Sequence, residues 1–439
     1  MSGVSRRAAL LGLAAFVAVL SLYANASFWV ERPAGLRFFP PFLAGVDINA
    51  NLHLGAENWS IAQALVAGRG FSDPFFVESG PTAWMPPLYP GFLALLLMLT
   101  GSPVAVAVLI VLCKNLTLVA SGAVVWEWAH RTRRRLPPAL ALVLFGVWIA
   151  THFAWFFQIT HDIWWVLLWI NGILWGALRL SDQDLSDKEA AGWGLLGGAT
   201  ALSSPIAGAS WGALTLFLAV VRRAPRLLVI AALVSATVVS GWVARNALVF
   251  GELVLVKSNL AYDLYQANYV SPDGVYDEPF LLRHPVIAAR RDANHEYRRL
   301  GEPAFIDLYA ERFGEAFRAE PGTVASKALN RFKAATLFYK PYRPRYEGNQ
   351  PPITSLVMAL PCVGLLIVLA LRRGRLTRLQ VCAVVLYGSF LLPYLLAAFY
   401  FRYLLPLSPL LTLFVFWALD AVASQQTAAE ASADAGASG

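Results

Sequence analysis

Glu57 is the first residue whose position suggests chemistry. It lies in GAENWSIAQALVAGRGF, residues 55–71, where the apolar residues have the spacing of a short amphipathic helix that ends at Gly68. The helix dipole favours a carboxylate in the first turn, so a simple capping role would account for Glu57. The other interpretation is an active-site carboxylate, and the spacing leaves both open.

A second carboxylate, Asp162, follows His161 at the start of the tryptophan-rich stretch HDIWW, residues 161–165. An N-cap Asp would explain this position without any chemistry. The alternative is a second active-site carboxylate, and the membrane topology derived below places Asp162 on the same side as Glu57.

Cations gather at the ends of other apolar segments. Arg245 and Asn246 close one segment, Lys257 with Asn259 follows just beyond it, and Arg402 with Tyr403 opens the last one. Arg and Lys at one membrane surface suit a phosphate group, although interfacial anchoring would use the same residues.

Several other kinds of site are not indicated. The sequence has no phosphate-cradling glycine loop, no nucleophile elbow and no metal-ligand spacing. Its three cysteines, Cys113, Cys362 and Cys382, lie inside apolar runs and are expected to be buried small hydrophobes. The net charge of +8 reflects arginine clusters between apolar segments, so we do not expect nucleic-acid binding.

The composition indicates the elements that must position these residues. Only 14% of the residues are charged and 58% are hydrophobic, and apolar windows approach the roughly 20 residues that cross a bilayer. Such a chain is expected to be a helical, polytopic membrane protein, because lipid forces backbone groups to pair within each segment.

Orientation follows from the basic clusters at 6–7, 131–135, 179–188, 222–226 and 372–378, which we assign to the cytoplasm. About ten crossings then alternate without conflict, with both termini cytoplasmic. A single crossing within 192–221 would place Arg222 outside, so two short helices are predicted around the break at Ser203–Pro205. The predicted crossings are 8–28, 103–128, 136–156, 161–180, two within 192–221, 227–249, 354–371, 379–398 and 403–423.

The domain prediction follows the same pattern. Residues 1–249 form an N-terminal transmembrane module that includes an outer first loop, 29–102, in which residues 86–101 form an interfacial helix. Residues 250–352 form a small mixed α/β segment on the same outer side, with a short strand at ELVLVK (252–257). Residues 353–424 are C-terminal transmembrane helices, and residues 425–439 are an Ala/Ser-rich tail that is expected to be disordered.

The order of these parts resembles the GT-C superfamily of polyprenyl-phosphate-dependent glycosyltransferases. It is similar in particular to the bacterial branch related to protein O-mannosyltransferases and the lipid A aminoarabinose transferase. The stretches that carry the resemblance are Glu57 with GRGFSDPF (68–75), GPTAWMPPLYP (80–90), Asp162, ARNALVFGELVLVKSNLAYDLYQAN (244–268), HP (284–285), LGEPAF (300–305) and RYLLPLSPLL (402–411). Ala56 precedes Glu57 where many relatives have an Asp-Glu pair, and Asp162 stands where relatives often have Glu.

The resemblance implies a sugar donor linked to a polyprenyl phosphate or diphosphate at the outer leaflet of a bacterial inner membrane. The reaction would invert the anomeric centre, and the acceptor would be a glycan, a lipid or a protein. Glu57 would handle the acceptor proton and Asp162 would support it. No cofactor is implied, and the need for a divalent cation stays open. Donor-phosphate contacts would come from Lys257, Arg402, Arg245 and Arg69, and further substrate contacts from His161, Tyr403, Asn259 and Tyr89.

Two other function classes stay open. A transporter or lipid flippase would explain Lys114 and Glu127 inside an apolar segment, although outer-face carboxylates are poor transport signatures. A polysaccharide polymerase or ligase would also use a lipid-linked donor.

Overall fold

A computed structural model of the chain describes residues 5–24, 56–75, 78–158, 162–182, 186–275, 284–285, 291–337, 352–371 and 376–437. Nearly all of this part is helical. The α-helices are α1 (Arg6–Ala24), α3 (Ala56–Val66), α4 (Leu88–Thr100), α5 (Pro103–Thr132), α6 (Pro138–Thr151), α7 (Ile163–Asp182), α8 (Asp187–Ser203), α9 (Pro205–Val221), α10 (Pro225–Phe250), α11 (Leu260–Tyr265), α13 (Arg291–Leu300), α14 (Glu302–Ala319), α15 (Gly322–Thr336), α17 (Pro352–Leu371), α18 (Arg378–Leu396) and α19 (Ser408–Ala437). Two π-helices, η3 (Ala154–Gln158) and η4 (Gln266–Val270), and a 3-10 helix, η5 (Phe401–Leu407), complete them.

Six of these helices are long and apolar enough to cross a membrane: α1, α5, most of α7, α10, α18 and the continuous segment from η5 into α19. The apolar helices α4, α6, α9 and α17 are shorter. The chain is therefore a multi-pass, all-α membrane protein. The specific number of ten crossings remains a prediction, although each predicted range contains a helix.

The break predicted near residue 204 is present. Helix α8 ends at Ser203, and Ser204 caps α9 by accepting a hydrogen bond from the Ala207 N–H at 3.3 Å. Pro205 occupies the first position of α9, where its missing N–H costs nothing. Two helices rather than one therefore fill residues 187–221.

One prediction about local structure is wrong. The described residues contain isolated bridges but no strand, so the α/β description of residues 250–352 does not hold within the described part of that segment. Residues 252–257 are non-helical but have no partner strand, and their neighbour is the side of α10. Helix α19 extends into the Ala/Ser-rich tail as far as Ala437, in keeping with the high helix propensity of its alanines, and the disorder expected for residues 425–439 stays a prediction.

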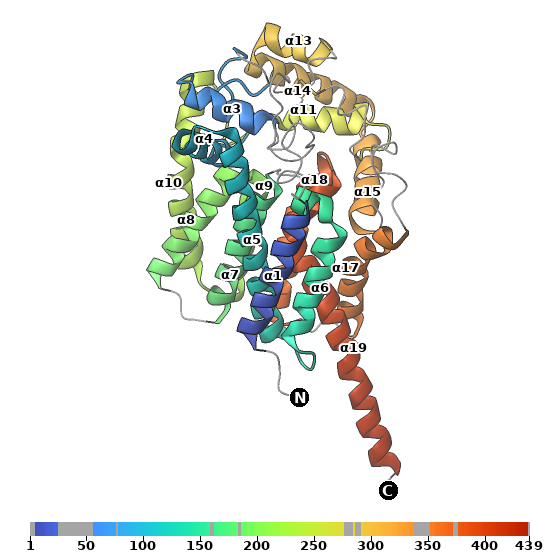
Figure 1. Cartoon of the computed structure of the whole chain (residues 1–439). Helices are drawn as coiled ribbons and strands as arrows, with labels where there is room; N and C mark the ends of the chain where they lie inside the picture. The colour runs from blue at the N-terminus through green and yellow to red at the C-terminus, as the bar shows by residue number, and fades with distance from the viewer. Residues whose placement is uncertain are drawn as a thin grey trace.

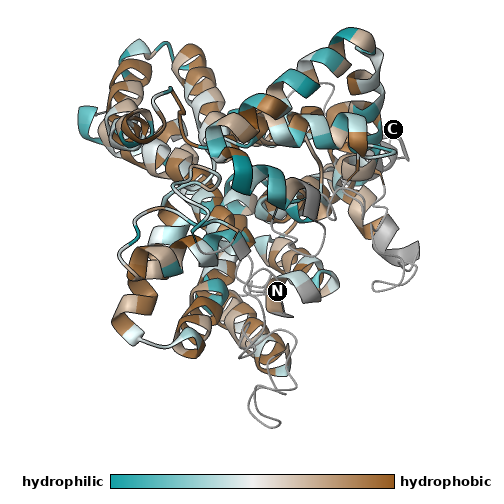
Figure 2. Cartoon of the chain, turned by 90° about the horizontal axis from the view of Figure 1, so that it is seen from above, coloured by the Kyte–Doolittle hydropathy of each residue, from teal (hydrophilic) through white to brown (hydrophobic). Residues whose placement is uncertain are grey.

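The long helices stand side by side as a bundle, and a smaller layer covers one end of it (Figure 1). This layer contains α3, α4, α11, α13 and α14, whereas both chain termini lie at the opposite end (Figure 1). Helix α19 runs through the bundle core, where Phe414 and Trp417 are buried, and α10 lies at its edge. Viewed from the covered end, the outer helices are largely hydrophobic and hydrophilic residues collect on the covering layer (Figure 2).

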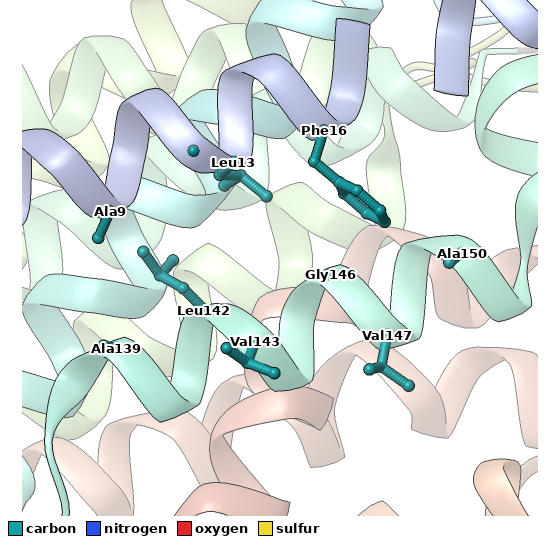
Figure 3. Close-up of a pocket in the computed structure, with 10 residues that line it drawn as sticks. Ala9, Leu13, Phe16, Ala139, Leu142, Val143, Gly146, Val147 and Ala150 are labelled. Carbon is teal, nitrogen blue, oxygen red and sulfur yellow. The ribbon is translucent and has the colours of Figure 1, made fainter. Parts of the chain in front are cut away.

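A cavity of about 520 Å³ lies between α1 and α6. Figure 3 shows its apolar walls, with Leu13 and Phe16 from α1 facing Leu142 and Val147 from α6. None of the predicted site residues lines it, so the candidate chemistry lies elsewhere, in the covering layer.

Candidate functional site

The structure places most of the predicted site residues at the covered end of the bundle. Glu57 is in the first turn of α3, and Asp162 directly precedes α7. Lys257 lies between α10 and α11, and Arg402 and Tyr403 belong to η5. Segments separated by hundreds of residues therefore contribute to one region.

Among the described residues, His284 lies beside the Glu57 carboxylate. Its Nε2 atom lies 3.7 Å from Glu57 Oε1, too far for a direct hydrogen bond but within ion-pair range. The imidazole stands edge-on to the rings of Phe75, Trp84 and Tyr262 at centroid distances of 5.7, 5.7 and 5.8 Å. This aromatic wall fixes the ring beside the carboxyl group.

The electrostatics of His284 connect Glu57 to the cations. Burial lowers the pKa of His284, the charges of Lys257 and Arg402 lower this pKa further, and Glu57 opposes the shift. A neutral imidazole does not neutralise Glu57 as a cationic partner would. Both Lys257 and Arg402 are near enough to act on this ring, so the predicted phosphate-binding cations and the predicted base share one site.

Asp263, on α11, is a third carboxylate in this region, and the sequence analysis did not single it out. Burial raises the pKa of Asp263 to about 6, Lys257 opposes the shift, and Glu57 adds to it. Asp263 therefore lies within electrostatic reach of both the predicted base and a predicted phosphate ligand.

Asp162 joins the same region through Tyr403. The charges of Asp263 and Asp162 both act on the Tyr403 hydroxyl, and the Arg402 guanidinium lies 5.5 Å from the centroid of the Tyr403 ring. The Tyr403 ring stacks on Tyr394 at 4.4 Å. We name this set the outer charge cluster; its members are Glu57, Asp162, Lys257, Asp263, His284, Arg402 and Tyr403.

Tyr89 and Asn259 border this cluster. Tyr89 is buried against Trp164 and Trp165, and the charge of Asp162 acts on its hydroxyl. Asn259 is buried at the N-terminal end of α11, where its carbonyl accepts a hydrogen bond from the N–H of Asp263. His161 lies outside the described residues.

Two predicted phosphate ligands are occupied in other ways. Arg245 donates to the carbonyls of Phe71 and Thr82, both at 2.8 Å, and its guanidinium also lies over the rings of Phe71 and Trp242. Arg69 forms an ion pair with Asp73 at 2.8 Å. These interactions stabilise the described part of the 69–82 loop, and among the described residues neither arginine forms a hydrogen bond or ion pair with a member of the outer charge cluster.

A fourth carboxylate, Glu302, links the segments of the covering layer by hydrogen bonds. Its carboxylate accepts hydrogen bonds from the Thr82 hydroxyl, the Ala83 N–H at 2.7 Å, the Ser258 hydroxyl at 2.8 Å and the Tyr297 hydroxyl at 2.8 Å. Burial raises the pKa of Glu302, and these four donors oppose that shift. Glu302 thus links the first loop to the segment carrying Lys257, and it holds both beside the cluster.

The buried Arg331 of α15 fixes the other side of the cluster. Its guanidinium donates to the Asn268 side chain at 2.7 Å and to the carbonyls of Leu395 at 2.5 Å and Leu396 at 3.1 Å. Burial lowers the pKa of Arg331 to about 10. This residue joins η4, which directly follows α11 and Asp263, to the end of α18.

The cluster offers carboxylates and cations rather than a metal-binding constellation. In the part of the chain that the structure describes, no group of three or more His, Cys, Asp or Glu side chains could hold a metal ion. What the arrangement can supply is a base for a hydroxyl group beside cations for a phosphate.

Comparison with other proteins adds no further assignment, because no family model, curated protein or solved structure matches the chain.

Proposed function

We propose that this protein is an integral membrane glycosyltransferase that moves a sugar from a polyprenyl-phosphate-linked donor to an acceptor, with inversion. The observation that carries the proposal is the outer charge cluster. It joins a carboxylate beside a buried histidine to two cations, at the end of a bundle of membrane-crossing helices. A lipid-linked donor would present its phosphate at such a membrane surface.

In the proposed reaction, the acceptor oxygen attacks the anomeric carbon on the face opposite the phosphate. The bond between that carbon and the phosphate oxygen breaks, a new glycosidic bond forms, and Glu57 takes the acceptor proton. Lys257 and Arg402 stabilise the negative charge that develops on the leaving phosphate, which is the main electrostatic demand of the step. Asp162 and Tyr403 orient the acceptor or stabilise positive charge on the sugar ring.

The acceptor would be a glycan, a lipid or a protein, and the site would face the outside of a bacterial inner membrane. Support for this orientation comes from basic residues at the start of α1, the end of α5 and the start of α10, which lie at the end of the bundle opposite the covering layer (Figure 1). Single cysteines at Lys188 and His295, both exposed, should react with an impermeant reagent from opposite sides of the membrane. Labelling of both from one side would reject the proposed orientation.

The function is tested by reconstituting the purified protein with polyprenyl-phosphate donors that carry radiolabelled sugars, together with a membrane extract that supplies acceptors. Transfer of label by the wild type, but not by Glu57→Gln, would support the proposal. Movement of the intact donor across the bilayer without transfer would reject it in favour of a flippase, for which the buried Lys114 of α5 is the motivating residue. Long chains of label would instead indicate a polymerase.

A further inference from the structure

The segment between α10 and α11 doubles back along the helix that precedes it. Helix α10 ends with Gly251 in the left-handed conformation, φ 73°, which favours glycine and reverses the chain. The Asn246 side chain then donates to the Val254 carbonyl at 3.0 Å, and the Trp242 indole donates to the Val256 carbonyl at 2.9 Å. Because the partners move backwards along α10 as the segment moves forwards, residues 252–257 run antiparallel to the helix.

From Leu253 to Val256 the side chains alternate as on a strand with one covered face, and Glu252 before them is exposed. Leu253 and Leu255 point outwards and are 72% and 64% exposed, whereas Val256 faces inwards and is only 8% exposed. Val254, between the two leucines, is partly buried. A strongly apolar face is therefore left uncovered by the protein.

Helix geometry gives the depth of this segment. Helix α10 has 26 residues, or about 39 Å at 1.5 Å per residue, whereas the hydrocarbon core of a bilayer is about 30 Å thick. Roughly 20 residues after Pro225, the second boundary of the hydrocarbon falls close to Arg245. Residues 254–256, which lie level with Asn246 and Trp242, are therefore at that boundary and not above it.

The apolar face of the segment also continues a surface that already faces lipid. Only 11% of the apolar window of α10 is buried inside the protein, and Leu248 near its end is 86% exposed. The two inward carbonyls are satisfied by Asn246 and Trp242, and headgroups and water can reach outward backbone groups at this depth. Lipid-exposed irregular backbone is excluded only from the hydrocarbon itself.

We propose that residues 252–257 form a membrane-inserted strap, with Leu253 and Leu255 embedded among the acyl chains at the boundary of the leaflet that the covering layer faces. The partner is the bilayer lipid itself. The strap ends at Lys257, whose long side chain can extend back from the hydrocarbon boundary so that its ammonium group reaches the lipid phosphates. Insertion of the strap does not depend on the proposed transferase activity; only the use of Lys257 on a donor phosphate does.

The test uses spin labels on single cysteines at Leu253, Val254 and Leu255, in full-length protein with Cys113, Cys362 and Cys382 replaced and reconstituted in phospholipid vesicles. Labels at 253 and 255 should respond to lipid-soluble oxygen and not to a water-soluble nickel complex, as a label at the lipid-facing control Leu233 does. A label at the exposed Glu311 should show the opposite behaviour.

Two results would reject the proposal that residues 252–257 insert into the membrane. Labels at 253 and 255 that behave like the Glu311 label would make the segment a water-exposed loop. Labels shielded from both reagents would indicate a protein partner on this face, such as a second copy. If the label at Val254 disturbs folding, a bimane fluorophore attached to the cysteine at 253 or 255, in vesicles whose lipids carry a nitroxide on the acyl chain, gives an independent readout that the 15 native tryptophans do not obscure, and absence of bimane quenching would reject insertion. None of these measurements requires a sugar donor, so they stand or fall separately from the transferase proposal.

Discussion

Glu302 and Glu57 are carboxylates in the same covering layer, but their surroundings differ. Glu302 is 3% exposed and accepts four hydrogen bonds, from the first loop, the Ser258 segment and α13. The side chain of Glu57 is 20% exposed, and within the described residues its ion-pair partner is His284, whose Nε2 lies 3.7 Å from the carboxylate, beyond hydrogen-bond distance.

The comparison distinguishes a carboxylate that stabilises the site, Glu302, from a carboxylate that can react with a substrate, Glu57. A buried carboxylate whose lone pairs are all used can stabilise structure but has no capacity left for a substrate. Glu57 retains that capacity, and it lies with Asp263 and Lys257 in a region where the charges act on one another. The two residues should therefore respond in opposite ways to the same substitution.

The largest effect is expected for Glu57→Gln. If Glu57 takes the acceptor proton, the amide keeps its size but removes the base, and turnover should fall by roughly 10²–10⁴-fold. The melting temperature should hardly change, because the side chain carries no buried network. Turnover and thermal unfolding of the same purified protein measure both quantities, with Glu311→Gln on the exposed face of α14 as the matched control. Normal turnover in Glu57→Gln would leave only the capping role.

Glu302→Gln should show the reverse pattern. An amide nitrogen would face two of the four hydrogen-bond donors, and losing contacts to a charged group costs about 1.5–3 kcal/mol each. Two such contacts amount to about 3–6 kcal/mol, and because hydroxyl donors can turn to accept from the amide we expect a loss of about 2–5 kcal/mol in the free energy of unfolding, with turnover per folded molecule close to normal. A stable variant with impaired turnover would mean that Glu302 contributes to chemistry and that the two carboxylates do not divide as proposed.

The features that sequence revealed are those encoded locally. Apolar windows located the membrane helices, and Ser203–Pro205 marked a true break, because length, capping and proline act over a few residues. Glu57 was placed correctly in a first helical turn for the same reason. The strand predicted at residues 252–257 is absent and the segment packs along α10 instead, because a short apolar run does not show which element covers it.

Features that depend on distant contacts were missed or misassigned. Arg245 has the residue type of a phosphate ligand, yet the 71–82 loop, far away in sequence, occupies its donors. Asp263 sits on a six-residue helix with no marker of its own, and only folding brings it near Glu57 and Lys257. The His-Pro pair at 284–285 is one of the stretches that carry the family resemblance. Its histidine is the sequence signal for the residues that lie beside Glu57.

The cations fall into two groups, as the two carboxylates do. Lys257 and Arg402 belong to the outer charge cluster, whereas Arg69 stabilises the first loop through its ion pair with Asp73. Lys257→Ala and Arg402→Ala should each lower donor kcat/KM by roughly 10–150-fold, equivalent to about 1.5–3 kcal/mol for one charge-assisted contact, with little change in acceptor KM. Arg69→Ala, which breaks only the ion pair with Asp73, is the control and should leave donor kinetics unchanged. Equal effects of all three substitutions would remove the distinction between the cluster and the loop, and would point to general surface charge.

The smallest effect concerns Asp263 and is visible only as a function of pH. Burial raises the pKa of this folded-state carboxyl from 3.8 to about 6, so the folded protein binds the proton more tightly than the unfolded chain does. The resulting stabilisation is fully present below about pH 4 and is lost as the pH rises through 6. Two pKa units correspond to at most about 3 kcal/mol, and partial exposure of the side chain reduces this to about 1–2 kcal/mol.

Asp263→Asn has no proton to lose, so its stability relative to the wild type should rise between pH 4 and 7. Unfolding midpoints across this range, with the exposed Asp307→Asn as control, measure the difference. Parallel curves for wild type and Asp263→Asn would show that Asp263 is not desolvated beside Glu57, and would separate it from the cluster.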